Sequence, residues 1–268
     1  MKLTVLCDNH TYIDQYYLGE PAASYLIEDG DRCVLFDTGY SDVFIENARR
    51  MGIDLSRVTD IVLSHGHNDH TGGLSAFFAE FSHPVRLTAH PAVFRRRRAD
   101  GLEVGSPIGI SEIPAWVEQN LTAEPMRLSE HVFYLGEIPR HYAFEAERAV
   151  GEAEVAQDHW EADHLPDDTG LALLGKDGLF LVAGCAHCGI CNMLRHAGTV
   201  TGESRISGIF GGMHLFDTDD RFFAALDELQ RQGAETLYPC HCTSLAVKAA
   251  MSTRFETVEV GVGMELEA

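Results

Sequence analysis

Four potential metal ligands follow an apolar, strand-like run, in the segment Asp60-Ile-Val-Leu-Ser-His65-Gly-His67-Asn-Asp69-His70. In an extended or looped backbone His65 and His67 can project the same way, while Asp69 and His70 lie one short turn further on. This spacing predicts two adjacent divalent-metal sites. Imidazole and carboxylate ligands suit Zn, the first expectation here, but also Mn or Fe. A polar loop of unrelated histidines is the alternative, yet a mostly apolar strand has little reason to end in such a cluster.

A pair of divalent ions at this loop would make the chain a binuclear metal-dependent hydrolase. Two ions about 3.5–4 Å apart can share a hydroxide and lower the pKa of bound water from about 15.7 towards roughly 7. The ions also polarise a carbonyl or phosphoryl oxygen, and Asp69 can orient the water or accept its proton. We therefore expect hydrolysis, or a closely related transfer, of a small molecule that contains an ester or a phosphate.

Apolar and β-branched runs bounded by Gly, Asp and Pro alternate with helical patterns along the chain. Strands are predicted near residues 2–7, 23–28, 32–37, 59–64, 84–89, 131–135, 170–175, 179–183, 206–211 and 235–239. Helices are predicted near residues 41–51, 72–80, 189–197 and 218–232. Asp-Gly turns predict hairpins at residues 27–33 and 174–179. This order indicates an α/β fold with two mixed sheets between helices.

The length of 268 residues and a hydrophobic content of 45% fit one domain, which we expect to span residues 1–268. Residues 91–168 interrupt the regular pattern, and we expect them to form an insertion over the active site. No apolar run approaches the ~20 residues that span a bilayer, and no secretory signal follows Met1. A cytoplasmic protein without membrane contact is therefore expected, and the sequence leaves a homo-oligomer open.

The net charge of the chain indicates which partners it can bind. The 41 acidic residues outnumber the 20 basic ones, which gives a net charge of −21. Because this excess repels a phosphate backbone, nucleic acid is not an expected partner. One basic cluster occurs at Arg95–Arg98. Four consecutive arginines point around a helix, so a solvated helix is favoured over a phosphate-binding role.

Seven cysteines are present, and five of them fall in two tight groups, at Cys185, Cys188 and Cys191 and at Cys240 and Cys242. An odd number without a signal peptide argues against a disulfide framework and for thiols that lie near a metal or are buried. Cys188 and Cys191 stand about one helical turn apart and offer a thiolate pair in principle. Structural packing is the favoured role for them.

The segment Ser64-His65-Gly-His67-Asn-Asp69-His70-Thr-Gly-Gly-Leu74 resembles the HxHxDH signature of the metallo-β-lactamase superfamily. Upstream, Val34-Leu-Phe-Asp37-Thr-Gly39 resembles the end of that superfamily's first hairpin, which implies that Asp37 supports the metal loop. Downstream, Gly184-Cys-Ala-His187 and Tyr238-Pro-Cys-His241 resemble its later histidine positions. The resemblance covers nearly the whole chain and implies an αββα sandwich.

Four further segments narrow the resemblance: Gly136-Glu-Ile-Pro-Arg140, Gly184-Cys-Ala-His187, Phe210-Gly-Gly-Met-His214 and Pro239-Cys-His241-Cys-Thr. They are similar to the subgroup named for a dihydropterin-methyl-aminobenzene ribofuranosyl-phosphate synthase of methanopterin biosynthesis. Most bacterial members of this subgroup are called only metal-dependent hydrolases. The resemblance therefore implies a pterin-related, synthase-like protein without transferring the named substrate.

The resemblance implies two ligand sets. Metal 1 would be held by His65, His67 and a third histidine, and metal 2 by Asp69, His70 and His241. The favoured third histidine is His187, which directly follows the predicted strand 179–183. The alternative is His164, which precedes a hairpin as the metal-1 histidine does in many other members. In that register Cys185 falls where a bridging Asp or a ligand Cys stands; otherwise it is a small buried residue beside the site.

Several residues have weaker assignments. His214 follows a predicted strand and two glycines that allow close backbone approach. It could therefore touch a metal, but we favour contact with the substrate or with a metal-ligating residue. Arg140, together with Arg95–Arg98, is a candidate for contact with a substrate anion. Asp167 and Asp168 either orient ligand histidines or serve as turn residues.

Two other functions use the same residues. An iron-dependent oxidoreductase is the alternative within enzymes, because this fold also hosts iron sites for oxygen chemistry. The chain shows no flavin-bearing partner domain, which lowers that option. A non-catalytic sensor that binds a small ligand is the alternative outside enzymes, and the intact ligand set disfavours it. The ligands set the chemistry and the insertion sets the pocket, so the sequence does not identify the substrate.

Overall fold

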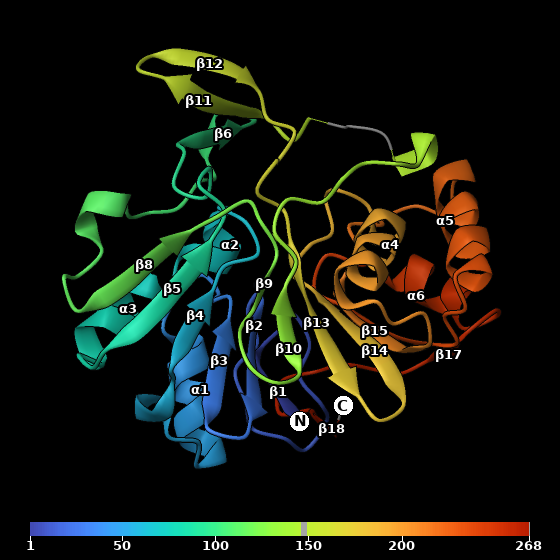
Figure 1. Cartoon of the computed structure of the whole chain (residues 1–268), viewed down its shortest axis with the longest axis horizontal. Helices are drawn as coiled ribbons and strands as arrows, with labels where there is room; N and C mark the ends of the chain where they lie inside the picture. The colour runs from blue at the N-terminus through green and yellow to red at the C-terminus, as the bar shows by residue number, and fades with distance from the viewer. Residues whose placement is uncertain (146–148, 268) are drawn as a thin grey trace.

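Two seven-stranded mixed sheets lie face to face, and helices cover the outer surface of each (Figure 1). This computed structural model describes residues 1–145 and 149–267. The arrangement confirms the αββα sandwich that the sequence predicts. Within the described residues, no helix is both long and apolar enough to cross a membrane.

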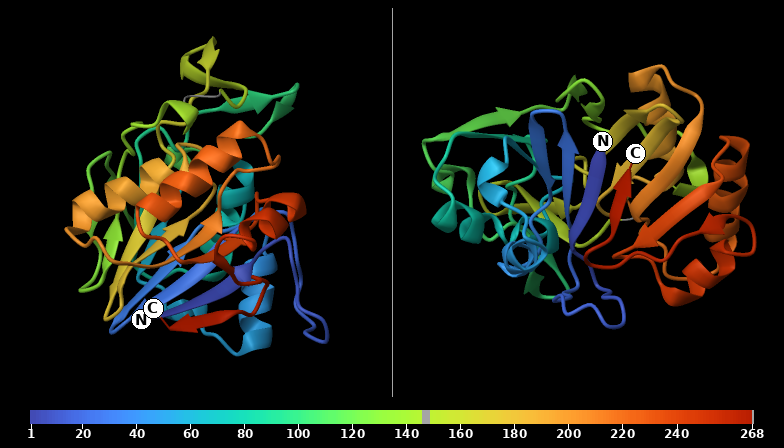
Figure 2. Two further views of the ribbon diagram at one scale, coloured as in Figure 1. Left: turned by 90° about the vertical axis from the view of Figure 1, so that its right-hand side faces the viewer. Right: turned by 90° about the horizontal axis from the view of Figure 1, so that it is seen from below.

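The first sheet has the strand order β18-β1-β2-β3-β4-β5-β8. In chain order its strands are β1 (Lys2–Cys7), β2 (Ser24–Asp29), β3 (Arg32–Phe36), β4 (Asp60–Val62), β5 (Val85–Ala89), β8 (Val117–Leu121) and β18 (Glu265–Glu267). Its outer face is covered by α1 (Val43–Met51) and α3 (Leu74–Glu80), which bury Phe44 and Phe77 against it. β18 pairs with β1, so the two termini lie side by side (Figure 2).

The second sheet has the strand order β17-β16-β15-β14-β13-β10-β9. In chain order its strands are β9 (Met126–Arg127), β10 (Val132–Tyr134), β13 (Gly170–Gly175), β14 (Gly178–Ala183), β15 (Ile206–Gly212), β16 (Thr236–Cys240) and β17 (Glu256–Thr257). The helices α4 (Ile190–Thr201), α5 (Asp220–Arg231) and α6 (Leu245–Met251) pack on its outer face. The side chain of Asp219 caps α5 by accepting a hydrogen bond from the backbone N–H of Phe222, which fixes where that helix begins.

The inner faces of the two sheets share one apolar layer. Tyr25 and Phe36 from the first sheet meet Phe210 and Val182 from the second, and the rings of Tyr25 and Phe210 lie edge to face at 5.0 Å. Each fully buried side chain of this size contributes roughly 1.5–3 kcal/mol. This layer therefore fixes the two sheets against each other and sets the edge at which their strands end.

Residues 91–168 divide between the main sheets and a separate small sheet. Strands β8, β9 and β10 join the two main sheets, whereas β6 (Arg97–Ala99), β7 (Leu102–Glu103), β11 (Glu152–Ala156) and β12 (His159–Ala162) form a four-stranded sheet that stands above the sandwich in Figure 1. The solvated helix expected at Arg95–Arg98 is wrong, because Arg97–Ala99 is a strand. The strand leaves Arg97 fully buried and its neighbours Arg96 and Arg98 exposed.

Both predicted hairpins are confirmed: β2 pairs with β3, and β13 pairs with β14, each in antiparallel register across its Asp-Gly turn. Three short 3-10 helices, Leu55–Arg57, Ile110–Glu112 and Ala143–Glu145, join longer elements. The pairs β3–β4, β14–β15 and β15–β16 are parallel. Parallel strands end at the same edge of a sheet, so the loops that follow them meet.

Candidate metal centre

The loops that follow β3, β4, β14, β15 and β16 carry the candidate ligands and the residues that support them. Four non-glycine residues in these loops have left-handed backbones, namely Asp37, Ala186, His214 and His241, with φ between 47° and 60°. Such conformations are costly for residues with a side chain and persist where the surrounding structure requires them. The strain therefore concentrates where the two sheets present their candidate ligands.

His65, His67 and His187 come together from two of these loops. The Nε2 of His65 lies 2.9 Å from the Nδ1 of His67, and the ring of His187 lies 4.8 Å from the ring of His65 and 5.1 Å from that of His67. The Sγ of Cys185 joins His65 and His187 in a group whose ligand atoms all lie within 4.8 Å of one another. His65, His67 and the favoured third histidine, His187, are the residues expected at metal 1.

Asp69, His70 and His241 form a second group, again with Cys185. The Nε2 atoms of His70 and His241 are 3.2 Å apart, and each lies near Asp69 Oδ2, at 3.6 Å and 3.4 Å. The Sγ of Cys185 is 3.3 Å from His70 Nε2. Cys185 thus contacts both groups, the position that a bridging ligand would take.

The residues present fit a bound cation. Nε2 of His67 and both ring nitrogens of His187 are buried and have no hydrogen-bond partner among the described residues. Leaving such an atom unsatisfied costs about 1–3 kcal/mol. A cation that accepts several lone pairs at once would satisfy these nitrogens, and zinc takes the same imidazole, carboxylate and thiolate ligands.

The protonation of the histidines differs between the two groups. Burial, together with the charges of the neighbouring histidines, lowers the pKa of His65 well below its ordinary value, and burial lowers the pKa of His67 to about 4. Both rings are therefore neutral at pH 7, which is the form that binds metal. Burial opposes the charged form of His70 as well, but Asp69 and Asp37 outweigh it and raise the pKa of His70 to about 9.

Asp37 contacts the loop that the resemblance implies it supports. Its Oδ2 lies 2.6 Å from His70 Nδ1, and it accepts hydrogen bonds from the backbone N–H and the hydroxyl of Ser64, both at 2.7 Å. A proton held on Nδ1 by Asp37 leaves Nε2 of His70 to face Asp69 and His241. Asp37 thus orients the ring of His70 from the Nδ1 side and serves as a support for this candidate ligand.

Arg97 supports the same loop from the small sheet, a role that no sequence pattern predicts. Its guanidinium is fully buried and pairs with Asp163 and Asp167, each at 2.7 Å. Asp167 in turn accepts a hydrogen bond from the backbone N–H of Gly66 at 2.9 Å. A Cβ at Gly66 would lie 1.9 Å from Arg97 Nη1, so only glycine lets the loop pass so close to this cation.

His241 is held by two residues whose role no sequence pattern predicts. Asp8 accepts the backbone N–H of His241 at 2.9 Å, and the Oδ1 of Asn9 lies 3.1 Å from His241 Nδ1. Both follow β1, the first strand of the chain. Because they stand 233 and 232 residues before His241, only the packing of the two sheets brings them to the site.

The remaining candidates lie in two places. His164 and Arg140 line a separate cavity of about 240 Å³, together with Asp168 and Cys188, whereas His214 lines the same cavity as His67 and His187. Cys188 and Cys191 are buried in the apolar core between α4 and the second sheet, Cys188 just before the helix and Cys191 in its first turn. The geometry therefore brings His187 to the candidate metal 1 ligands and leaves His164 outside them.

A cavity of about 380 Å³ opens over the two groups, with Asp69, His187, His214 and His241 among its lining residues. Tyr40, Pro21 and Phe216 form apolar walls, and Ala99, Val104 and Val150 close it from the side of the small sheet. This volume falls in the range of about 300–1,000 Å³ typical of small-molecule sites. The cavity can therefore hold a substrate directly against the candidate ligands.

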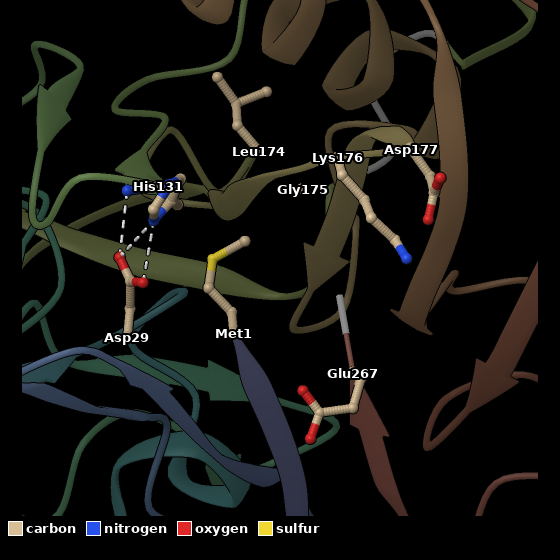
Figure 3. A pocket seen from close by; sticks show the side chains of 8 residues that line it. All are labelled: Met1, Asp29, His131, Leu174, Gly175, Lys176, Asp177 and Glu267. Atoms are coloured by element: carbon tan, nitrogen blue, oxygen red, sulfur yellow. Dashed lines mark hydrogen bonds and ion pairs between the residues drawn. The ribbon is translucent and has the colours of Figure 1, made fainter.

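A larger cavity, of about 700 Å³, lies by the turn between β13 and β14, at the other end of β14 from His187 (Figure 3). Its walls include Lys176, Glu267 and an Asp29–His131 ion pair of 3.0 Å. Among the described residues, none of the candidate metal-binding groups draws a member from it. The larger volume of this cavity is therefore no reason to place the catalytic site there.

Asp168 gives a pH-dependent prediction. Burial raises its pKa from 3.8 to about 6, although it accepts a hydrogen bond from the backbone N–H of Cys188. A raised carboxyl pKa means that the folded state favours the protonated form, so stability falls as pH rises from about 4 through about 6. The difference between the ordinary and the folded-state pKa of Asp168 corresponds to about 3 kcal/mol of stability at high pH, a cost that Asp168→Asn avoids.

We expect Asp168→Asn to gain up to this amount over the metal-free parent above about pH 7 and little near pH 4. Denaturant unfolding of both proteins in chelator across this range measures the difference, with the substitution Asp177→Asn in the β13–β14 turn as control. A difference that did not change with pH would contradict the prediction.

Comparisons with known proteins extend over most of the chain. The model of the metallo-beta-lactamase superfamily matches residues 18–241. The chain is 27% identical over 273 residues to 7,8-dihydropterin-6-methyl-4-(beta-D-ribofuranosyl)-aminobenzene-5'-phosphate synthase of Methanocaldococcus jannaschii, covering 96% of this chain and 92% of that protein. The structure matches Tm1679, a metal-dependent hydrolase of the beta-lactamase superfamily, with a TM-score of 0.86 and 28% identity over 100% and 99% of the two chains. A diphosphatase from the PhnP family shares the fold, with a TM-score of 0.55 and 17% identity over 100% and 97%.

Proposed function

Because this chain belongs to the metallo-beta-lactamase superfamily, we propose that it is a binuclear metal-dependent hydrolase, or a related transferase, for a small ester- or phosphate-containing molecule. The observation that carries the proposal is the convergence of six histidine and aspartate side chains, four of which line one cavity. Among the described residues, buried ring nitrogens of His67 and His187 have no hydrogen-bond partner. A non-catalytic sensor does not need all six of these candidate metal ligands. An iron oxidoreductase would use them too, and metal analysis separates the two.

We assign the ligands in two sets that share Cys185. His65, His67 and His187 would hold metal 1, and Asp69, His70 and His241 would hold metal 2. Divalent ions, with zinc expected, would supply Lewis-acid polarisation of a carbonyl or phosphoryl oxygen and would acidify water. Asp37, Asp167 and Asn9 orient the loops and rings behind the ligands, which is the support that metal sites depend on.

Asp69 is the candidate proton acceptor. Burial opposes its charge, but the nearby His70 and His241 outweigh that and hold the pKa of Asp69 well below its usual range. The carboxylate is therefore ionised at neutral pH and lines the cavity. It can orient an attacking water and accept its hydrogen bond, while the apolar side walls limit competing solvent.

The walls of the cavity favour a substrate with a flat ring. Tyr40 and Phe216 are partly exposed, at 42% and 52%, and both line the cavity above the ligands. Aromatic side chains stack on ring systems of this kind. The synthase from Methanocaldococcus jannaschii is named for an aromatic product that bears a phosphate, which supports the same substrate class for this chain. Arg140 lies in the separate cavity, so it has no part in this substrate contact.

A substrate panel tests the proposed function. Metal-loaded protein should hydrolyse at least one member of a panel of aryl phosphomonoesters, phosphodiesters and lactones, and a chelator should abolish the activity reversibly. The double variant His65→Ala, His67→Ala should lose most of metal 1 in elemental analysis and the turnover with it. A double variant that kept the full metal content and activity of the parent would show that this loop is not the metal centre.

The chain should not bind nucleic acid. Its charge of −21 leaves only local basic groups to neutralise phosphates, and Arg97, within the basic cluster, is committed to Asp163 and Asp167 inside the protein. Gel-shift titration with RNA and DNA at low salt should give no complex at micromolar protein. Sub-micromolar binding with a steep salt dependence would contradict this prediction.

A further inference from the structure

Two cysteines and a histidine meet at the wall of the metal-site cavity. Cys185, His214 and Cys242 each offer one ligand atom, and these atoms all lie within 4.8 Å of one another. All three residues line the cavity of about 380 Å³. They come from three separate loops, which follow β14, β15 and β16, so the parallel strands place them side by side.

The backbone is arranged so that Cys242 can reach this position. A Cβ at position 212 would lie 2.6 Å from Cys242 Sγ, so Gly212 leaves the space that the thiol occupies. The backbone N–H of His214 donates to Cys242 Sγ at 3.3 Å, and His214 takes a left-handed φ of 47°. Cys242 Sγ also lies 3.5 Å from the carbonyl oxygen of Cys185.

Two observations point to a ligand rather than to packing. The Nδ1 of His214 is buried and has no hydrogen-bond partner among the described residues. Cys242 is partly exposed at the cavity, whereas Cys7, Cys33, Cys185, Cys188, Cys191 and Cys240 are buried. A cysteine kept only for packing is normally buried as a small apolar residue.

We propose that Cys185, His214 and Cys242 form a third metal position that takes a thiophilic divalent cation such as Zn²⁺ or Cd²⁺. A tetrahedral zinc ion with Zn–S of about 2.3 Å and Zn–N of about 2.0–2.1 Å holds its ligand atoms roughly 3.3–3.8 Å apart, which this cluster reaches with small side-chain movements. Thiolates select such ions over Mn or Mg. Two cysteines and one histidine leave a fourth position, and here it opens on the cavity.

Binding at this position releases the two thiol protons to solvent as the thiolates form bonds to the cation. Only Cys185 is shared with the two sets of the proposed function, in which it is the bridging residue. His214 and Cys242 belong to neither set. The third position therefore extends the proposed centre, and its loss can be observed separately through Cys242.

Cobalt titration of the full-length, metal-stripped protein tests the proposal, because Co²⁺ bound to thiolate gives a sulfur-to-metal charge-transfer absorption. The parent should take up three equivalents of Co²⁺ with this absorption. Cys242→Ser should bind the third equivalent at least about 100-fold more weakly and lose part of the absorption. The matched control Cys191→Ser removes a buried thiol that donates to the carbonyl of Ala225 and should titrate like the parent.

His214→Ala provides a second variant, and it should weaken the third equivalent while keeping the absorption of both thiolates. His65→Ala, His67→Ala should lose metal 1 but keep the absorption from Cys242, which separates failure of this position from failure of the proposed function. Uptake of no more than two equivalents by the parent would overturn the proposal. If correctly folded Cys242→Ser bound the third equivalent as tightly as the parent and kept the full absorption, the proposal would be overturned as well.

Discussion

Replacing Arg97 with Met is expected to lower the free energy of unfolding by about 3–5 kcal/mol. The guanidinium is fully buried between Asp163 and Asp167, and its removal leaves two buried carboxylates without a cation. Asp167 also holds the backbone of Gly66, so the loop that carries His65 and His67 loses its support. We expect reduced metal 1 affinity together with the lower stability, measured by denaturant unfolding and metal titration.

The neighbouring arginine provides the matched control. Arg98 is exposed and pairs with Glu152 at 2.8 Å on the surface of the small sheet, and exposed ion pairs are worth about 0–1 kcal/mol. Arg98→Met should therefore leave metal affinity unchanged and shift stability only within that range. Equal effects of the two substitutions would show that burial of Arg97 has no special role in supporting the loop.

His187→Ala is expected to lower both metal 1 occupancy and turnover by at least about 100-fold. Its ring lies against those of His65 and His67, and both of its nitrogens are buried without partners among the described residues. A missing ligand would leave metal 1 with two histidines and Cys185. Elemental analysis after dialysis and steady-state kinetics measure the two effects.

His164→Ala is the matched control for this prediction. His164 lines the separate cavity, so its removal should leave metal 1 occupancy near that of the parent. If His164→Ala instead lost the metal and His187→Ala kept it, the ligand assignment would move to His164.

Much of the fold and the core of the site can be predicted from the sequence, because they depend on local patterns. The strand before His65, the two Asp-Gly hairpins and the spacing from His65 to His70 are each readable within about fifteen residues. The sandwich then follows, since these elements need two sheets to bury their apolar faces.

The sequence does not predict the supporting roles of Arg97, Asp8 and Asn9, because each role depends on contacts between distant segments. Arg97 stands in a run of four arginines whose pattern suggests solvent, and only the strand β6 turns it inwards to Asp163 and Asp167. Asp8 reaches His241 only because the strands of both sheets end at the same edge. Cys242 lies beside His214 only because the loops after β15 and β16 meet.

Anomalous diffraction at the metal absorption edge, from crystals of the protein loaded with its native metal, tests the central claim most directly. Besides any peak at Cys185, His214 and Cys242, two peaks are expected at the cavity of about 380 Å³. One should have His65, His67 and His187 nitrogens at about 2.0–2.1 Å, and the other should have Asp69, His70 and His241 at about 2.0–2.2 Å. The absence of a peak that His187 reaches, or of any peak at the loop of residues 65–70, would contradict the account.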